Sequence, residues 1–255
     1  MLWLGLVALL SACGRLEFDS ESGHPDVGAP QLGAQRDPRL DHLEIMDATP
    51  SDVGLDPGLR LWLRFAPGDL LRDSVTGVNA SCSSCPVATG GPGRDAASFT
   101  GTECLFLSDR PELHSQTFSI AAWIRPGNVG TAFAKAVGDS ILNSWEIRWS
   151  AAEHLHLNTS DGASNNGLSS AVYMPGTWLH VVGTFDRGTT AIFTNGAFVD
   201  EHTRTLSVDF DDHPVSVGCD LDSGVLDELI TADLADIRFY DRVLTPSEIA
   251  DLASE

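Results

Sequence analysis

Short segments in which apolar and polar side chains alternate run through most of this chain, and they constrain its fold more than any other feature. In residues 59–65 the leucines and Phe65 fall on one face and both arginines on the other. Successive side chains of a β-strand point to opposite faces, so this pattern predicts a strand with one buried face. Similar alternation or a β-rich run recurs at 118–124, 145–149, 154–157, 178–185, 190–194, 197–204, 214–219 and 234–240.

Turn signals separate these segments: Pro126-Gly127, Asp161-Gly162, Pro175-Gly176, Asp186-Arg187-Gly188 and Asn195-Gly196. Asn-Gly between two strand-like runs predicts a tight β-hairpin. Many short strands with such turns predict an all-β sandwich or barrel. Near the end, a capping box of Thr245 and Glu248 with Pro246 between them predicts one short closing helix.

Composition narrows the class of protein. The chain has 255 residues, of which 42% are hydrophobic and 20% charged, values typical of a globular protein able to bury a core. Its formal net charge of −21 repels phosphate backbones, so the sequence predicts no nucleic-acid partner. An excess of carboxylates suits hard cations such as Ca²⁺.

The N-terminus indicates export. Residues 1–12 form an uncharged apolar run that is too short to span a bilayer but fits the core of a secretory signal. Leu10-Ser11-Ala12-Cys13 resembles a bacterial lipoprotein box, although no Lys or Arg precedes the run. We therefore predict a signal peptide over 1–13 with lipid on Cys13, a flexible tether over 14–57 and a folded domain over 58–255. An ordinary signal peptide is the alternative.

This prediction places the protein on the cell envelope. The lipid would be its only contact with a membrane, at the outer membrane or cell surface, and the domain would lie in the periplasm or outside the cell.

Export also bears on the cysteines. Beyond Cys13, an even number remains, Cys82, Cys85, Cys104 and Cys219, and an oxidising compartment favours two disulfides. Cys82 and Cys85 are close in sequence, so we expect each to bridge to Cys104 or Cys219. The competing interpretation is a zinc knuckle at Cys82-Ser-Ser-Cys85, but no second Cys-x-x-Cys accompanies it.

Four stretches resemble one family. Phe118–Pro126, Gly176–Asp186, Thr194–Gly196 and Leu234–Ile249 match, in order and spacing, the conserved strands of the laminin-G-like jelly roll in the concanavalin A-like lectin/glucanase superfamily. The resemblance implies an antiparallel two-sheet jelly-roll sandwich with a short C-terminal helix. It leaves the function open, because one fold can carry many functions.

The resemblance also implies a calcium site. Asp73 lies in a segment similar to an early acidic loop of the family, and Asp236 stands where the family has an Asp in its closing motif. The two could share a structural Ca²⁺, since the first and last strands of a jelly roll are neighbours. The alternatives are a turn-capping role for Asp73 and an ion pair of Asp236 with an arginine such as Arg238.

Other candidate sites are weaker. His154 and His156 share one strand face and could chelate a metal, but outward-facing histidines alternating with inward-facing Leu155 and Leu157 explain the segment better. The six tryptophans include only one candidate for exposure, Trp62, and core packing is the expectation for Trp123, Trp145, Trp149 and Trp178.

Catalysis is not indicated. Glycosidases need two carboxylates flanking the scissile bond, and neither Glu44–Asp47 nor Asp227-Glu228 has suitable spacing. The sequence therefore predicts a secreted or surface-anchored binding module, not an enzyme, that recognises carbohydrate through unidentified residues. The alternatives are a module that binds an envelope or extracellular protein, or serves structurally, and, less favoured, a hydrolase with an unrecognised site.

Overall fold

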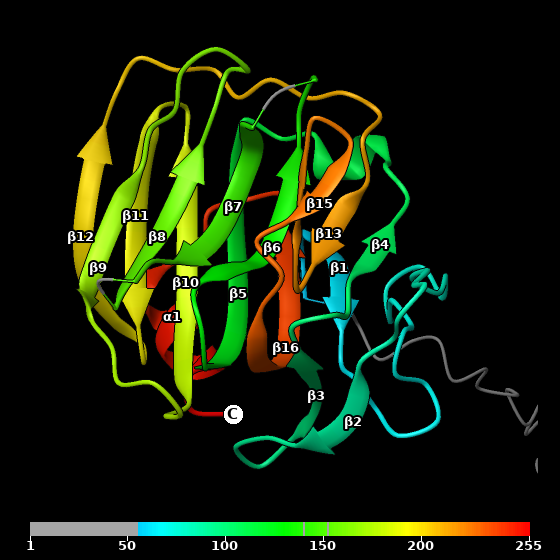
Figure 1. Cartoon of the computed structure of the whole chain (residues 1–255). Coiled ribbons are helices and arrows are strands. Elements are labelled where there is room, and N and C mark those ends of the chain that lie inside the picture. Colours follow the sequence, from blue (N-terminus) through cyan, green and yellow to red (C-terminus); the bar gives the residue numbers. More distant parts are fainter. Residues whose placement is uncertain (1–55, 140, 152) are drawn as a thin grey trace, which may run out of the picture. The chain divides into compact units, whose positions relative to one another are not determined.

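The computed structural model describes residues 56–139, 141–151 and 153–255, and these residues form two antiparallel β-sheets that lie face to face as two layers (Figure 1). The larger sheet has eight strands in the order β12-β11-β10-β5-β16-β3-β2, with β1 also paired to β16. Its strands are β1 (Leu59–Leu63), β2 (Val87–Gly90), β3 (Asp95–Thr100), β5 (Thr117–Pro126), β10 (Leu179–Asp186), β11 (Thr189–Thr194), β12 (Ala197–Thr203) and β16 (Thr231–Tyr240). The predicted all-β sandwich is confirmed.

The smaller sheet has six strands in the order β4-β13-β6-β7-β8-β9. They are β4 (Leu105–Leu107), β6 (Gly130–Ala136), β7 (Asn143–Trp149), β8 (His154–Thr159), β9 (Leu168–Val172) and β13 (Val215–Val217). A separate hairpin of β14 (Asp220–Asp222) and β15 (Val225–Asp227) follows β13. The remaining elements are a 3₁₀ turn, η1 (Pro111–Leu113), and one helix, α1 (Pro246–Leu252).

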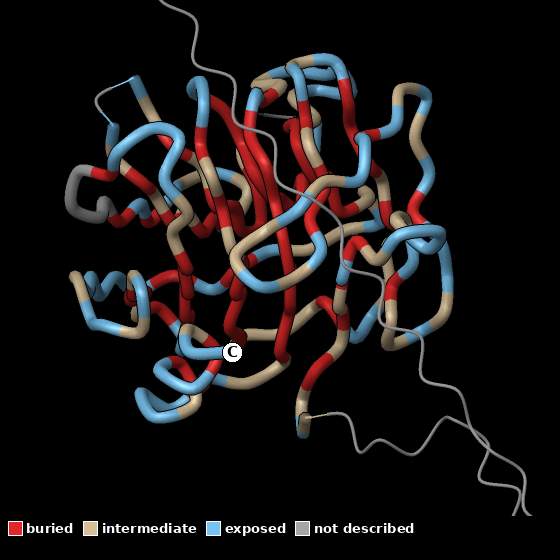
Figure 2. Tube along the Cα trace, turned by 90° about the horizontal axis from the view of Figure 1, so that it is seen from below, coloured by how far each residue is buried: buried red, intermediate tan, exposed pale blue. Residues whose placement is uncertain are grey.

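The core lies between the sheets, where alternate side chains from both layers meet. Figure 2 shows burial concentrated along the strands, while the connecting loops are exposed. Trp145 packs at the centre, with ring centres 4.9 Å from Phe133 and 5.3 Å from Phe239. Trp145 and Trp149 are fully buried, as predicted from their shared face with Ile147.

Local signals at the turns and the helix are also confirmed. Asn195 and Gly196 both have positive φ and connect β11 to β12, because only such residues tolerate this tight turn. The Thr245 hydroxyl accepts a hydrogen bond from the Glu248 backbone N–H, and the Glu248 carboxylate accepts one from Thr245 N–H. The helix packs Ile249 and Leu252 on a second apolar cluster, which includes Tyr240 and Val182, on the outer face of the larger sheet.

The disulfide pairing corrects the prediction. Cys82 pairs with Cys85, and Cys104 with Cys219. The turn through Ser83 and Ser84 brings the first two Cα atoms to 5.3 Å, a normal disulfide separation, so their closeness in sequence is no obstacle. Cys104 and Cys219 lie just beyond the paired residues of β4 and β13, with their Cα atoms 5.5 Å apart.

The predictions for the N-terminus concern a different part of the chain. The predicted signal peptide, Cys13 and almost all of the predicted tether lie outside the described residues. Among the residues that the structure describes, no helix is long and apolar enough to cross a membrane.

Candidate functional site

A hollow opens on the outer face of the larger sheet. It lies where the strand paired with one edge of β16 changes from β3 to β1. β3 pairs with residues 231–234 of β16, and β1 pairs with residues 237–240. Between these stretches β16 bulges: Asp236 and Ile237 both stand opposite Ala122, and Asp236 has φ 54°. Aspartate tolerates this left-handed backbone better than most residues, and the bulge directs its carboxylate to the outer face.

The hollow has a volume of about 720 Å³ and combines an aromatic ring with charged groups. It is lined by Trp62, Arg64, Gly91, Gly93, Arg94, Asp95, Asp236, Arg238 and Glu255. These residues come from the end of β1, the turn between β2 and β3, the bulge of β16 and the segment after α1. The site is therefore assembled from four parts of the chain.

Asp236 is the centre of its polar network. Its carboxylate accepts hydrogen bonds from Trp62 Nε1 at 2.5 Å, from Arg238 Nε and Nη2 at 2.9 Å, and from Arg94 Nη1. Burial opposes the charge of Arg238, but the Asp236 carboxylate beside it raises the pKa of Arg238 well above its usual value. Arg238 thus stays charged beside the Asp236 carboxylate, which also holds the Trp62 indole in place.

Two guanidinium groups lie against the Trp62 ring. The central carbons of Arg64 and Arg238 are both 4.8 Å from the ring centre, a distance typical of cation–π contacts. Arg238 is fixed by its carboxylate partners, whereas Arg64 is exposed and makes no ion pair with another described residue. Arg64 is thus the adaptable member of the pair.

Unpartnered polar atoms lie beneath the hollow. Arg94 stacks over Trp123 at 5.1 Å, and Trp123 contacts the ring of His180. Arg94 Nε, Trp123 Nε1 and His180 Nδ1 are buried and have no hydrogen-bond partner among the described residues. His180 is 2% exposed; burial lowers its pKa to about 4 against the opposing charge of Asp236, so it is neutral at physiological pH.

The tryptophan prediction needs correction at two positions. Trp123 and Trp178 do not lie in the core but are partly buried on the outer face, with Arg94 and Arg125 stacked on them. Alternation along β5 already carried this signal, because Trp123 stands between the inward-facing Ala122 and Ile124. Trp62, expected to be exposed, is partly buried as well.

Asp73 and Asp236 both bind protein groups rather than forming a ligand cluster. Asp73 is fully buried and accepts hydrogen bonds from Trp62 N, Val75 N, Thr76 Oγ1 and Arg110 Nη1. The contacts of Asp73 therefore match the alternative in which it caps a turn. The contacts of Asp236 match the alternative in which it pairs with an arginine. Neither belongs to the groups of described side chains that lie close enough together to hold a metal ion.

A calcium ion at Asp73 stays a prediction. The hydrogen bonds that Asp73 makes to protein groups argue against it. We expect Asp73→Asn to lower the free energy of unfolding by about 2 kcal/mol, through lost hydrogen bonds to a buried carboxylate. Since Arg110 already neutralises this carboxylate, the loss should be equal with and without Ca²⁺ in thermal denaturation. A calcium-dependent rise in melting temperature that Asp73→Asn removes would contradict this expectation.

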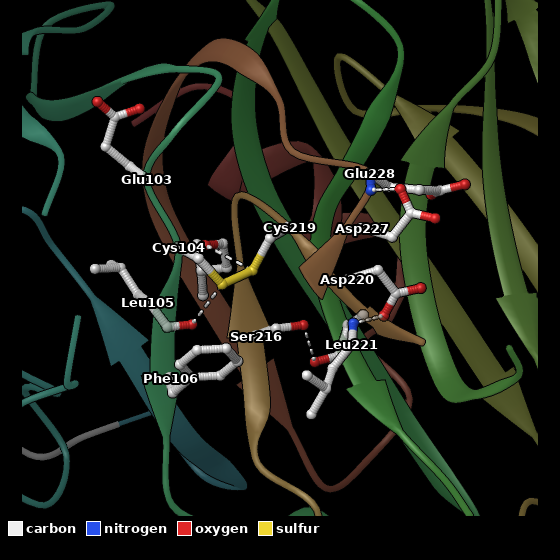
Figure 3. Close-up of a disulfide and its surroundings, with 12 residues drawn as sticks. Glu103, Cys104, Leu105, Phe106, Ser216, Cys219, Asp220, Leu221, Asp227 and Glu228 are labelled. Carbon is white, nitrogen blue, oxygen red and sulfur yellow. Dashed lines mark hydrogen bonds between the residues drawn. A yellow bond between two sulfur atoms is a disulfide. The ribbon is translucent and has the colours of Figure 1, made fainter. Parts of the chain in front are cut away.

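A second cluster of charged groups lies on the outer side of the smaller sheet. Glu146 of β7, Asp220 at the start of β14 and Glu228 after β15 have carboxylate oxygens within 4.8 Å of one another, and Asp211, Asp212 and His213 form another such group. The Cys104–Cys219 disulfide joins the start of the β14–β15 hairpin to the segment before β4 (Figure 3). It thereby fixes the position of Asp220.

Glu146 is one of two buried members of this cluster, the other being Asp220. Its carboxylate accepts hydrogen bonds from Asn158 Nδ2 at 2.5 Å and Asn143 Nδ2 at 3.2 Å, and Asn143 also donates to Asp220 at 2.7 Å. Burial raises the pKa of Glu146 to about 7, and Asp220 adds to the effect against the Asn158 hydrogen bond. Glu146 is only 6% exposed, so a substrate has little access to it.

Sequence reasoning missed this cluster because its members come from three separate segments. The one available signal was that Glu146 alternates with Trp145 and Ile147 and so faces away from the core. His154 and His156 likewise lie on the outer side of β8, while Leu155 and Leu157 are fully buried, as the alternation predicted. Burial and the nearby Arg148 lower the pKa of His156.

Comparison with known proteins decides the family. Residues 99–250 match a family described as the concanavalin A-like lectin/glucanases superfamily. The chain belongs to this superfamily. A search of curated proteins found no significant match.

Solved structures share the superfamily fold at low sequence identity. The binding domain of Paraclostridial Mosquitocidal Protein 1 aligns with a TM-score of 0.63 and 13% identity, over 77% of this chain and 52% of that one. Domain 4 of the arabinanase AbnA from Geobacillus stearothermophilus, solved with arabinotriose, aligns with a TM-score of 0.61 and 19% identity. The alignment covers 76% of this chain and 98% of that one. The receptor binding domain of botulinum neurotoxin type G aligns with a TM-score of 0.59 and 16% identity, over 77% of this chain and 51% of that one.

These likenesses concern the fold alone. The chain spans about half the length of the two toxin binding domains and nearly all of the arabinanase domain. This member of the superfamily therefore has the architecture of known binding domains, and its own ligand must be argued from its side chains.

Proposed function

We propose that this domain is a non-catalytic module that binds carbohydrate in the hollow beside Trp62. The observation that carries the proposal is the combination of a partly exposed indole with charged hydrogen-bonding groups in one concave site. Sites for small ligands typically pair apolar surface with a few fixed polar groups.

The chemistry of the hollow suits a sugar. When the exposed Arg64 moves off the Trp62 indole, the C–H face of a pyranose or furanose ring can pack there, while its hydroxyl groups bond to charged side chains. Asp95 and Arg94 offer an acceptor and a donor on the turn between β2 and β3, and Asp236 already orients the indole. The arabinanase domain with the same fold, solved with arabinotriose, supports this class of ligand.

Export remains part of the proposal. A lipid on Cys13 and a tether would hold the domain at the cell envelope, where polysaccharides are available. This part rests on the sequence pattern at residues 1–13 and on the disulfides, which are typical of an oxidising compartment.

The first test is Trp62→Ala. Loss of the stacking surface should weaken binding of the full chain to its sugar by about tenfold or more, since a buried aromatic contact at the centre of a site carries much of the binding energy. A glycan array, with arabino-oligosaccharides included, identifies the ligand, and isothermal titration calorimetry measures the change.

The matched control is Trp178→Ala. Trp178 is also partly buried on the outer face and stacked with an arginine, but it does not line the hollow. Its loss should leave affinity unchanged, and thermal denaturation shows whether each variant folds. Equal losses in both variants, or sugar binding that survives Trp62→Ala, would sink the proposed site. Absence of any glycan hit, with specific capture of a purified envelope protein, would favour the alternative role as a protein-binding module.

A further inference from the structure

Arg238 carries two carboxylates of very different character. Asp236 binds its Nε and Nη2 from a buried position, with 11% of its side chain exposed. Glu255 binds the same Nη2 at 2.6 Å from the surface, with 50% of its side chain exposed. The Glu255 carboxylate therefore occupies an open position on a fixed guanidinium group at the edge of the hollow.

The Arg238–Glu255 pair can be exchanged at its Glu255 end. Glu255 is half exposed, and Asp236 keeps the buried Arg238 paired, so replacing Glu255 by another carboxylate costs little. Because Asp236 holds the guanidinium in place, an incoming carboxylate meets a donor that is already oriented. Charge-assisted hydrogen bonds from arginine to a carboxylate are among the stronger ones in proteins.

Arg64 adds a second positive charge that has no ion-pair partner among the residues described. It lies against the same Trp62 ring as Arg238 and lines the same hollow. A neutral sugar would leave this charge unused, whereas an acidic sugar would approach it favourably.

We propose that the hollow recognises a sugar bearing a carboxylate, of the uronic acid type, and that this carboxylate takes the place of Glu255 on Arg238. This inference rests on the proposed carbohydrate site and specifies the class of sugar. The ring of the sugar packs on Trp62, and Arg64 turns toward the ligand.

The ligand carries few charges. The formal net charge of −21 repels a polyanion approaching from a distance, while the arginines act over a short range. An oligosaccharide with one carboxylate gains the local attraction without the full repulsion that a highly charged polymer meets.

The experiment compares an oligosaccharide containing one glucuronic acid with the same molecule after reduction of the carboxyl group to an alcohol. Calorimetry on the full chain should show about tenfold tighter binding of the acid. Arg64→Gln should lower this preference without abolishing it, because Arg238 still binds the carboxylate. Glu255→Gln should strengthen binding of the acid about threefold, with little change for the reduced form, because the competing carboxylate is gone.

Asp251→Asn is the matched control for Glu255→Gln, since it removes one negative charge from an exposed position on α1 outside the hollow. Equal gains in the two variants would mean a general charge effect and would overturn the exchange. Equal binding of the acid and the reduced sugar, lost together in Trp62→Ala, would overturn the inference and leave the proposed function standing. If neither sugar binds and the glycan array gives no hit, both the inference and the proposed function are wrong.

Discussion

Replacing Cys104 and Cys219 together with alanine is expected to lower the free energy of unfolding by about 5 kcal/mol. The bridge joins residues 115 apart, so its removal releases a long loop in the unfolded chain, and loop-closure entropy grows with loop length. For a domain of this size the melting temperature should fall by roughly 10–20 °C. Urea denaturation under non-reducing conditions measures the loss.

The Cys82–Cys85 bridge is the matched control within the same chain. It spans only three residues, and the same entropy argument gives about 2 kcal/mol for its removal. A double alanine variant at these positions should therefore be clearly more stable than the Cys104/Cys219 variant. Comparable losses for the two bridges would mean that local strain or packing, and not chain entropy, sets their contribution.

Glu146→Gln is expected to stabilise the domain at pH 8 and to change little at pH 5. Burial raises the pKa of Glu146 in the folded protein to about 7, above its usual value of 4.5, so the folded state binds a proton that the unfolded chain releases. The wild-type domain loses stability as the pH rises from about 4.5 through 7. The loss approaches roughly 3 kcal/mol above pH 8. Glutamine stays neutral, so its curve lacks this fall.

A glutamate of opposite behaviour provides the control. Glu103 accepts hydrogen bonds from Thr100 and Thr102; burial opposes its charge, but these bonds prevail and lower its pKa to about 2. Glu103 therefore contributes stability above pH 4.5 that is lost as the pH falls toward 2, and Glu103→Gln should destabilise the domain at pH 8. Unfolding free energies measured from pH 4 to pH 9 test both variants. Parallel curves for Glu146→Gln and the wild type would contradict the predicted ionisation of Glu146.

Features that depend on neighbouring residues were predictable from the sequence. Alternation placed Trp145 and Leu155 in the core, Asn195-Gly196 marked the hairpin, and the capping box marked the start of the only helix among the described residues. Each signal works because the physical cause lies within a few residues of its effect. The jelly-roll sandwich followed from the sum of such signals and from the family resemblance.

Features that depend on distant segments were not predictable in the same way. The Cys104–Cys219 bridge needs β4 and β13 to lie side by side, which no local pattern states. The hollow needs the bulge at Asp236 and the change of neighbour along β16. The Glu146 cluster needs three segments that meet only after the hairpin docks. In each case the residues can be read from the sequence, but which of them lie close together in the fold cannot.

The change of neighbour along β16 divides the proposed ligand site into a part built on a central strand and a part built on a turn. Asp236 and Arg238 belong to a central strand, so altering them disturbs the sandwich itself. The turn at one side is different: a side chain at Gly91 would lie close to Arg94 and Ala235, and one at Gly93 would meet no other atom within 4 Å but would sit on a backbone with φ 78°. Insertions in this turn, or an asparagine at Gly93, which tolerates positive φ, would thus reshape the opening of the proposed site while the scaffold stays the same.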